Sequence, residues 1–524
     1  MLDGTSSLLA HRLRNAGLLF LSLAFLPLDT LILFISFLFR TILPNEVEHR
    51  RREARQDHGF HPRTILVTGI GMTKGLVLAR LFYEAGHDVV GADFEPDGAL
   101  ACGRVSRALR KFYRLQTPGI SSASSPDMYI QNLLDIVTRE KVDLWVSCSG
   151  VASAVEDGMA KEVVEKRTKC KAIQFDVHTT QILHEKHSFI QHTRDIGLNV
   201  PETHEITSRA EVERILRETP SGRKYIMKTI GVDDSVRADM TLLPKSSGVE
   251  TSKHLARLKI SAQCPWILQQ YIRGKEYCTH SLVVNGEVKA FVACPSAELL
   301  MHYEALPAES PLSQAMLDFT KRYAANGGRG FTGHLSFDFM VEEGDEKAED
   351  ITLYPIECNP RAHTAVALFN GTTAVVDAYL SALDGAENRN GASDDNGNGT
   401  PATTQDPTTP VIHPAHHDKY FWIGHDLVTL VILPTSSLLF PLLPSGRSSS
   451  SASSTSVRTT LQDHAVFIRH VASPTWKDGT FQPWDPLPWW WLYHFYWPLR
   501  FWDCLVRGRK WSRVNVSTTK MFEC

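Results

Sequence analysis

The chain has 524 residues, more than one hydrophobic core usually holds, so two or three packed lobes are expected. Hydrophobic residues at 43% and charged residues at 22% are ordinary for a globular protein and argue against a disordered chain or a multi-span membrane protein. The formal net charge is -3 and no basic face stands out, so small molecules, and no nucleic acid, are the expected partners. The 9 cysteines form no CxxC pair, which argues against a disulfide framework or a structural zinc site.

Residues 1–60 are predicted to form a hydrophobic anchor helix followed by a basic linker. The apolar run from Gly17 to Phe39 is long enough to cross a bilayer core of about 30 Å, although Pro27 and Asp29 lie inside it. More arginines follow the run than precede it, which predicts a membrane-associated protein whose later domains face the cytosol. An amphipathic segment that packs against the protein is the alternative interpretation.

Residues 61–180 are predicted to form a Rossmann-like lobe. Between Thr64 and Asp93 the pattern reads strand, glycine loop, helix and strand, which is typical of a βαβ unit with a parallel sheet. Gly69, Gly71 and Gly75, with Asp93 at the end of the second strand, resemble a dinucleotide-binding loop, but their spacing is not GxGxxG.

An NAD(P)-dependent oxidoreductase is therefore an alternative to consider. Tyr271 and Lys275 match a YxxxK pattern, whose chemistry needs both side chains on one helical face. Gly274 interrupts that spacing, and residues 266–272 are typical of a strand. The oxidoreductase remains the weaker hypothesis.

A set of charged and polar residues downstream favours an ATP site. No GxxxxGK[ST] loop is present, so two lysines from separate segments, Lys186 and Lys228, are the candidates to neutralise a triphosphate. Lys228 lies on an apolar strand, where an unpaired ammonium group would be costly. The backbone of one segment is expected to line an adenine edge, and Glu276 is expected to reach the ribose hydroxyls. That segment comprises Gln269, Gln270, Tyr271 and Ile272.

Three oxygen-bearing side chains predict a magnesium site. Asp338 lies in an apolar strand, and Glu357 and Asn359 alternate along the next strand so that both point to one face. Oxygen ligands of this kind suit Mg²⁺, which also binds substrate phosphates. Arg361 is expected to stabilise charge that develops on transferred phosphate, with His363 assisting it.

The C-terminal part is predicted to contain two linkers and an aromatic region. Residues 384–418 and the serine-rich stretch 445–456 cannot bury enough apolar surface to fold, so both are predicted linkers. Residues 419–524 form a hydrophobic and aromatic region that includes the run from Trp484 to Trp502. These rings suit either a membrane interface or a docking surface for another lobe.

The order of these residues resembles the ATP-grasp superfamily over roughly residues 64–383. More narrowly, GMTK, DSVR, GKEYCTHS, ECNPRAHTA and WDPLPWWWLYH resemble the ligases that form mycosporine-glycine in mycosporine-like amino acid biosynthesis, and related fungal-type secondary-metabolite enzymes. The resemblance implies an α/β fold with an ATP-grasp domain at 181–383. In place of a glycine-rich flap the chain has Asp233, Asp234, Ser235 and Arg237, and Ser235 and Arg237 are expected to cover the phosphates.

The activity implied by this resemblance is that of a carbon–nitrogen ligase with its catalytic domain in the cytosol. ATP with Mg²⁺, which Mn²⁺ can replace, would phosphorylate a carboxylate or enolic oxygen of a small acceptor. The amine of an amino acid would then displace the phosphate. A membrane-tethered ATP-binding protein without catalysis, acting as a regulator or scaffold, is the alternative from another class.

Overall fold

The computed structural model describes residues 2–42, 46–118, 126–148, 150, 153–220, 222–229, 241–296, 301–344, 351–387, 410–439 and 457–524. These residues divide into two compact units. Unit 1 comprises Met1–Gln174, Ala297–Ala305 and Arg361–Cys524, and unit 2 comprises Phe175–Ser296 and Leu306–Pro360. Arg237 with its neighbours Asp233 to Ser235, residues 388–409 of the predicted linker 384–418, and the serine-rich stretch 445–456 lie outside the described residues. Residues 384–387 of that predicted linker are instead the last residues of a helix, Ala374–Glu387.

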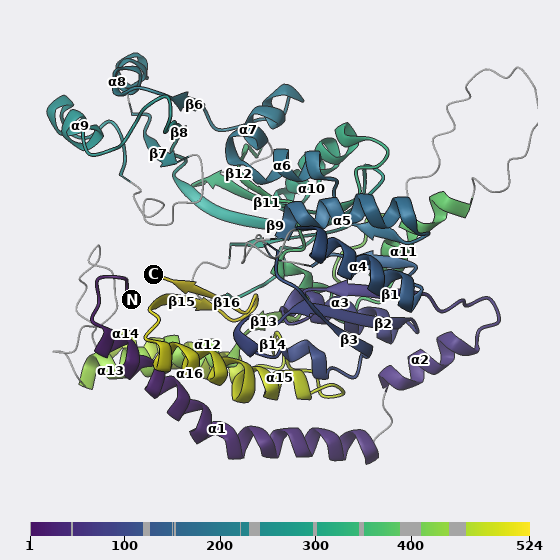
Figure 1. Cartoon of the computed structure of the whole chain (residues 1–524). Helices are drawn as coiled ribbons and strands as arrows, with labels where there is room; N and C mark the ends of the chain where they lie inside the picture. Colours follow the sequence, from purple (N-terminus) through teal and green to yellow (C-terminus); the bar gives the residue numbers. More distant parts are fainter. Residues whose placement is uncertain are drawn as a thin grey trace, which may run out of the picture. The chain divides into compact units, whose positions relative to one another are not determined.

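Unit 1 contains a five-stranded parallel sheet in the order β3-β2-β1-β4-β5 (Figure 1). The central strands are continuous apolar runs because helices cover the sheet and leave no face for water. Tyr129, Leu133 and Val164, from two of these helices, pack with Leu66 and Trp145 of the sheet in one buried cluster. The strands are β1 (Thr64–Thr68), β2 (Asp88–Phe94), β3 (Leu109–Leu115), β4 (Leu144–Val146) and β5 (Lys171–Ile173); the helices are α3 (Thr73–Glu84), α4 (Pro126–Glu140), α5 (Ala154–Arg167) and α11 (Ala374–Glu387).

The predicted strand–loop–helix–strand unit at Thr64–Asp93 is confirmed, and its glycines have a structural explanation. Gly69 adopts φ +71°, and a Cβ at Gly75 would lie 2.4 Å from the Gly69 carbonyl oxygen, so the loop and α3 pack too closely for a side chain. The Asp93 carboxylate is buried and accepts hydrogen bonds from the backbone N–H groups of Gly71 and Phe94. Asp93 thus closes the loop, and the pattern does not require a dinucleotide.

The C-terminal region of unit 1 packs onto this sheet layer through its aromatic residues. Trp484 stacks on Tyr83 with ring centroids 5.5 Å apart, and Trp489 and Trp497 are buried, whereas Trp502 is 58% exposed. Most of the aromatic run is therefore a docking surface within unit 1. The elements are β13 (Lys419–Phe421), α12 (Ile423–Asp426), α13 (Leu433–Leu439), α14 (Val457–Ala472), β14 (Trp476–Asp478), α15 (Leu487–Trp491), α16 (Trp497–Arg507), β15 (Trp511–Asn515) and β16 (Lys520–Glu523).

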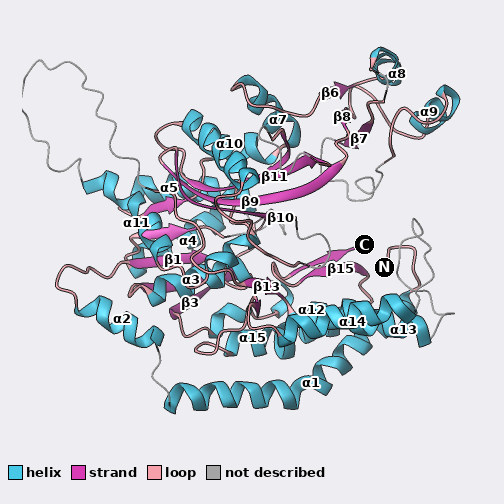
Figure 2. Ribbon diagram, turned by 180° about the vertical axis from the view of Figure 1, so that it is seen from behind, coloured by secondary structure: helices cyan, strands magenta, loops and turns pink. Residues whose placement is uncertain are grey.

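The N-terminal apolar run forms the helix α1 (Leu8–Ile42), which is followed by α2 (Glu46–Gln56). Among the described residues, α1 is the one helix that is long and apolar enough to cross a membrane, a test that a signal sequence also passes. Both views place α1 alongside α15 and α16 (Figures 1 and 2).

Unit 2 contains two antiparallel sheets, a three-stranded one in the order β6-β8-β7 and a four-stranded one in the order β10-β9-β11-β12 (Figure 2). The predicted strand at 266–272 is confirmed over Trp266–Gln270 as β8, and the predicted strands around Asp338 and Glu357 are confirmed as β11 and β12. The strands are β6 (Thr203–Ile206), β7 (Tyr225–Thr229), β8 (Trp266–Gln270), β9 (Gly274–Val284), β10 (Glu287–Pro295), β11 (Gly333–Glu342) and β12 (Leu353–Asn359); the helices are α6 (Val177–His184), α7 (Lys186–Asp195), α8 (Arg209–Glu218), α9 (Gly248–Leu255) and α10 (Pro311–Gly327).

The first prediction concerns a buried ion pair that ties the C-terminal region to α3. Arg80 Nε donates to Asp485 Oδ2 at 2.9 Å, and the two side chains are 1% and 0% exposed. Replacing Arg80 with alanine leaves the Asp485 carboxylate buried without its counter-charge, so Arg80→Ala should lower the free energy of unfolding by about 3–5 kcal/mol in denaturant titrations. The exposed Arg110, paired with Glu140, is the control, because Arg110→Ala should cost at most about 1 kcal/mol. Equal losses for the two variants would contradict the assignment.

Candidate functional site

The predicted magnesium ligands lie on one face of adjacent strands in unit 2. Asp338 of β11 is paired directly with Glu357 of β12, and Ser336 is paired with Asn359. Residues opposite each other in an antiparallel pair share a face, and so do residues two apart. Accordingly, Asn359 Nδ2 donates to Asp338 Oδ2 at 3.2 Å. The three side chains therefore offer oxygen atoms at one place, which fits a hard cation such as Mg²⁺.

A β-bulge immediately follows this pair. Asp338 is opposite Glu357, but the next residue, Phe339, is opposite Pro355, so Ile356 is an extra residue in β12. A bulge of this kind bends the strand and redirects the side chains beside it. Here it shifts the register directly beside the carboxylates, and the pairing then continues from Phe339 opposite Pro355 to Val341 opposite Leu353.

Lys186, at the first position of α7, pairs with one of these carboxylates. Its Nζ lies 2.7 Å from Glu357 Oε2, and the two side chains are 39% and 36% exposed. An ion pair this exposed adds little to stability. Its significance is positional, since it brings a cationic side chain to the predicted metal ligands.

Lys228 of β7 belongs to the same electrostatic cluster. Its Nζ donates to Gln269 Oε1 at 2.5 Å. Burial, and then nearby Lys186, lower the pKa of Lys228 to about 8, whereas Glu357 and Glu276 act in the opposite direction. Unit 2 thus brings both predicted phosphate-binding lysines together with the predicted metal ligand Glu357.

Glu276 lies on the same face of the four-stranded sheet as Asp338. Cys278 is paired with Asp338, and Glu276 is two residues away along β9, so both point to that face. The carboxylate of Glu276 is exposed and accepts a hydrogen bond from Ser296 Oγ at 2.8 Å. This position leaves it available to a hydroxyl-bearing ligand.

Part of the segment predicted to line adenine already forms backbone hydrogen bonds within unit 2. The Gln270 N–H donates to the Glu202 carbonyl at 2.8 Å, and the Tyr271 N–H donates to the Lys224 carbonyl at 2.7 Å. The side chain of Gln269 is buried against Lys228, and Ile272 is buried. Two of the expected backbone donors therefore already have partners, which limits what this segment can offer to a purine.

An open pocket of about 880 Å³ in unit 2 is lined by Gln270 and Tyr271, but not by Lys186, Lys228 or any predicted metal ligand. Its other lining residues include Arg223 and Glu342. We assign the candidate site to the cluster of charges, because phosphate and metal binding depend on those groups rather than on the volume of a neighbouring groove.

Unit 1 contains a second group of basic side chains, which includes the predicted Arg361 and His363. Lys74, 1% exposed, donates from Nζ to the Ala362 carbonyl at 3.0 Å. Burial, and then Arg361, lower the pKa of Lys74 to about 7, and burial with both cations lowers the pKa of His363 to about 3. His363 is therefore neutral, and its Nδ1 accepts from the Ala365 N–H at 3.2 Å, which leaves the proton on Nε2.

The sequence patterns did not single out Lys74 as a site residue. Its only signal was its place in the segment Gly71-Met-Thr-Lys74, which carried part of the family resemblance. Arg237 is outside the described residues, so its predicted role at the phosphates stays a prediction.

No protein-family model matches the sequence, and no curated protein matches it. Solved structures that share part of its arrangement include L-amino acid ligase from Bacillus licheniformis, with 13% identity and a TM-score of 0.37 over 57% of this chain and 66% of the ligase. N5-carboxyaminoimidazole synthetase from Staphylococcus aureus complexed with ADP has 13% identity and a TM-score of 0.40 over 58% of this chain and 71% of the synthetase. The biotin carboxylase domain of Hydrogenobacter thermophilus 2-oxoglutarate carboxylase, in complex with MgADP, has 13% identity and a TM-score of 0.38 over 57% of this chain and 64% of that domain. This chain thus spans slightly less than two thirds of the first and third proteins, and the assignment of activity rests on the site itself.

The second prediction follows from the pKa of Lys228. If its ammonium group binds phosphate, affinity for ATP should fall as the pH rises through about 8, because the protonated form is lost there instead of near 10.5. Titrations of ATP between pH 7 and 9 should show binding about tenfold weaker at the upper end. Lys228→Arg keeps its charge throughout this range and should give a nearly flat profile. An equally steep profile in that variant would exclude Lys228 as the titrating group.

Proposed function

We propose that this chain is an ATP-dependent carbon–nitrogen ligase of the ATP-grasp type. The observation that carries the proposal is the cluster in unit 2, where Asp338, Glu357 and Asn359 offer oxygen ligands beside Lys186 and Lys228. The lysines suit a polyanionic ligand, and the carboxylates suit a divalent cation bound to that ligand. Mg-ATP is such a ligand.

In the proposed reaction the two lysines bind the triphosphate from separate elements, α7 and β7, and hold its terminal phosphate in place. Lys186 exchanges its partner Glu357 for a phosphate oxygen, and Lys228 gains an anion that favours its charged form. Mg²⁺, held by Asp338, Glu357 and Asn359, would supply neutralisation of the phosphate oxygens. Positioning and charge neutralisation supply most of the catalysis that phosphoryl transfer requires.

Transfer of the γ-phosphoryl group to an acceptor oxygen gives a phosphorylated acceptor and ADP. The amine of an amino acid then attacks the activated carbon, the carbon–oxygen bond breaks, and inorganic phosphate leaves with the electron pair of that bond. The amine gives up a proton in this step. In unit 1, Lys74 is buried and Arg361 lies near enough to lower its pKa. The role of Arg361 in stabilising charge on the transferred phosphate stays a proposal from the sequence.

The finer assignment rests on the sequence resemblance. It makes the acceptor a cyclohexenone whose enolic oxygen is phosphorylated, the amine that of glycine, and the setting the synthesis of mycosporine-like secondary metabolites. It also requires the catalytic units to face the cytosol, which supplies ATP.

The third prediction tests the ligand set. Glu357→Gln removes the charge that meets both Lys186 and the metal, and Asn359→Ala removes an oxygen donor on the same face. Each variant should lose about 100-fold or more of the phosphate released from Mg-ATP in the presence of pooled amino acids and candidate acceptors. The measurement is acceptor-dependent release of inorganic phosphate by the full chain.

Glu287→Gln is the matched control, because Glu287 lies on β10 of the same sheet, is 70% exposed and pairs with Lys289. It should retain the activity of the unaltered chain. ATP binding without acceptor-dependent phosphate release would instead favour the regulatory or scaffold protein, and near-normal rates in Glu357→Gln would remove the metal assignment.

A further inference from the structure

The helix α1 is joined to unit 1 along one side. Asp29, in the middle of its apolar sequence, lies with Oδ2 2.8 Å from His494 Nε2. Ser22 Oγ donates to the Tyr493 carbonyl at 2.9 Å, and Trp490 Nε1 donates to Thr30 Oγ1 at 3.1 Å. The polar side chains that weakened α1 as a membrane span therefore have partners on α15 and the π-helical turn that follows it.

The start of α1 is fixed to the C-terminal hairpin of the same unit. Trp511 Nε1 donates to Asn15 Oδ1 at 2.9 Å, and Arg14 Nη1 donates to the Ser512 carbonyl at 3.1 Å. Lys510 Nζ donates to the carbonyl oxygens of Gly4 and Ser6 at 2.9 and 2.8 Å. These bonds hold the residues before and within the first turns of α1 against β15.

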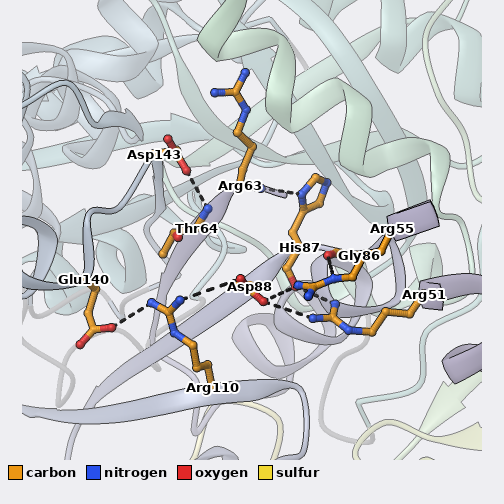
Figure 3. A network of polar contacts seen from close by, with 10 residues as sticks. All are labelled: Arg51, Arg55, Arg63, Thr64, Gly86, His87, Asp88, Arg110, Glu140 and Asp143. Atoms are coloured by element: carbon orange, nitrogen blue, oxygen red, sulfur yellow. Dashed lines mark hydrogen bonds and ion pairs between the residues drawn. The ribbon is translucent and has the colours of Figure 1, made fainter. Parts of the chain in front are cut away.

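The chain that follows α1 is fixed to the same unit as well. Arg51 of α2 donates to the carbonyl oxygens of Tyr83 and His87 at 2.6 and 2.7 Å. Arg51 and Arg55 both pair with Asp88 at the start of β2 (Figure 3). Because the start of α1 and the helix α2 that follows it are both bonded to the same unit, a crossing helix would have to break one of these two sets of bonds.

The opposite side of α1 presents large apolar side chains to solvent. Exposed fractions reach 72% at Phe20. Along α16, Leu499, Trp502 and Val506 are also exposed at a spacing that puts them on one helical face. An apolar surface of this extent marks an interaction site rather than ordinary exposure. Its exposed members on α1 include Phe20, Leu23, Leu31, Phe34, Leu38 and Phe39.

We propose that α1 lies in the plane of one bilayer leaflet and seats unit 1 on the membrane surface without crossing it. At 35 residues, α1 is roughly 52 Å long, well beyond a hydrocarbon core of about 30 Å. The exposed arginines Arg12 and Arg52, before and after the apolar stretch, suit anionic headgroups, and the exposed Trp502 suits the interface. Phospholipid with anionic headgroups is therefore the occupant that matches both the apolar face and the charges beside it.

The fourth prediction is a flotation experiment with the full chain and preformed vesicles of phosphatidylcholine and phosphatidylserine. The unaltered protein should float with the vesicles. A variant with Phe20→Glu, Leu31→Glu and Phe34→Glu should have an affinity for the vesicles that is lower by about tenfold or more. The reason is that three exposed apolar contacts with lipid are replaced by charge. The control carries Met128→Glu and Met159→Glu, at exposed positions on α4 and α5, and should float normally.

The proposal would be overturned if the unaltered chain did not float, or if it formed a dimer through α1 that does not bind the vesicles. Thermal unfolding in detergent checks that the variants are folded. The second measurement distinguishes a surface seat from a span, using epitope tags at the two ends of the chain in sealed membrane vesicles from expressing cells. Added protease should digest both tags or spare both, and protection of one tag alone would show a crossing helix. Neither result depends on catalysis.

Discussion

The close placement of Lys186 and Lys228 beside Glu357 is the interaction on which the account of function depends. Burial of Lys228 makes its charged form costly, and its hydrogen bond to Gln269 offsets only part of that cost. The nearby carboxylates Glu357 and Glu276 favour the charged form of Lys228, whereas the positive charge of Lys186 disfavours it. A triphosphate would relieve the repulsion between the lysines, and a divalent cation would replace Lys186 beside Glu357. On the proposed function, the cluster would therefore be more stable with Mg-ATP bound than without it.

The local fold and the strand pattern of the site could be predicted from the sequence. The βαβ unit that begins at Thr64, and the strands that carry Asp338 and Glu357, have periodicities that specify strand or helix over short stretches. The alternation that puts Glu357 and Asn359 on one face follows from strand geometry alone, and their approach to Asp338 follows from the pairing of β11 with β12. The spacing of Tyr271 and Lys275 illustrates the reverse, because the same four-residue separation falls at the start of β9 and not on a helix.

Contacts between distant segments could not be predicted from one sequence. Arg80 and Asp485 are 405 residues apart, and nothing local to either indicates the other. Lys74 was missed for the same reason, since its bond to the Ala362 carbonyl and its proximity to Arg361 arise from packing. The boundary between the two compact units also falls inside the Pro355–Arg361 segment, after Pro360. The amino-acid composition does not change there, so the sequence gives no sign of the boundary. Likewise, an apolar helix with Asp29 inside it looks like an imperfect span until its partner His494 is seen.

The most direct test of the central claim is a calorimetric titration of the full chain with ATP, with and without Mg²⁺. If Asp338, Glu357 and Asn359 hold the metal beside the two lysines, Mg²⁺ should tighten ATP binding by about tenfold or more, which corresponds to about 1.4 kcal/mol. The same titration with Asp338→Asn should show most of that gain removed. Equal affinity with and without Mg²⁺ in the unaltered chain, or no binding of ATP, would contradict the account.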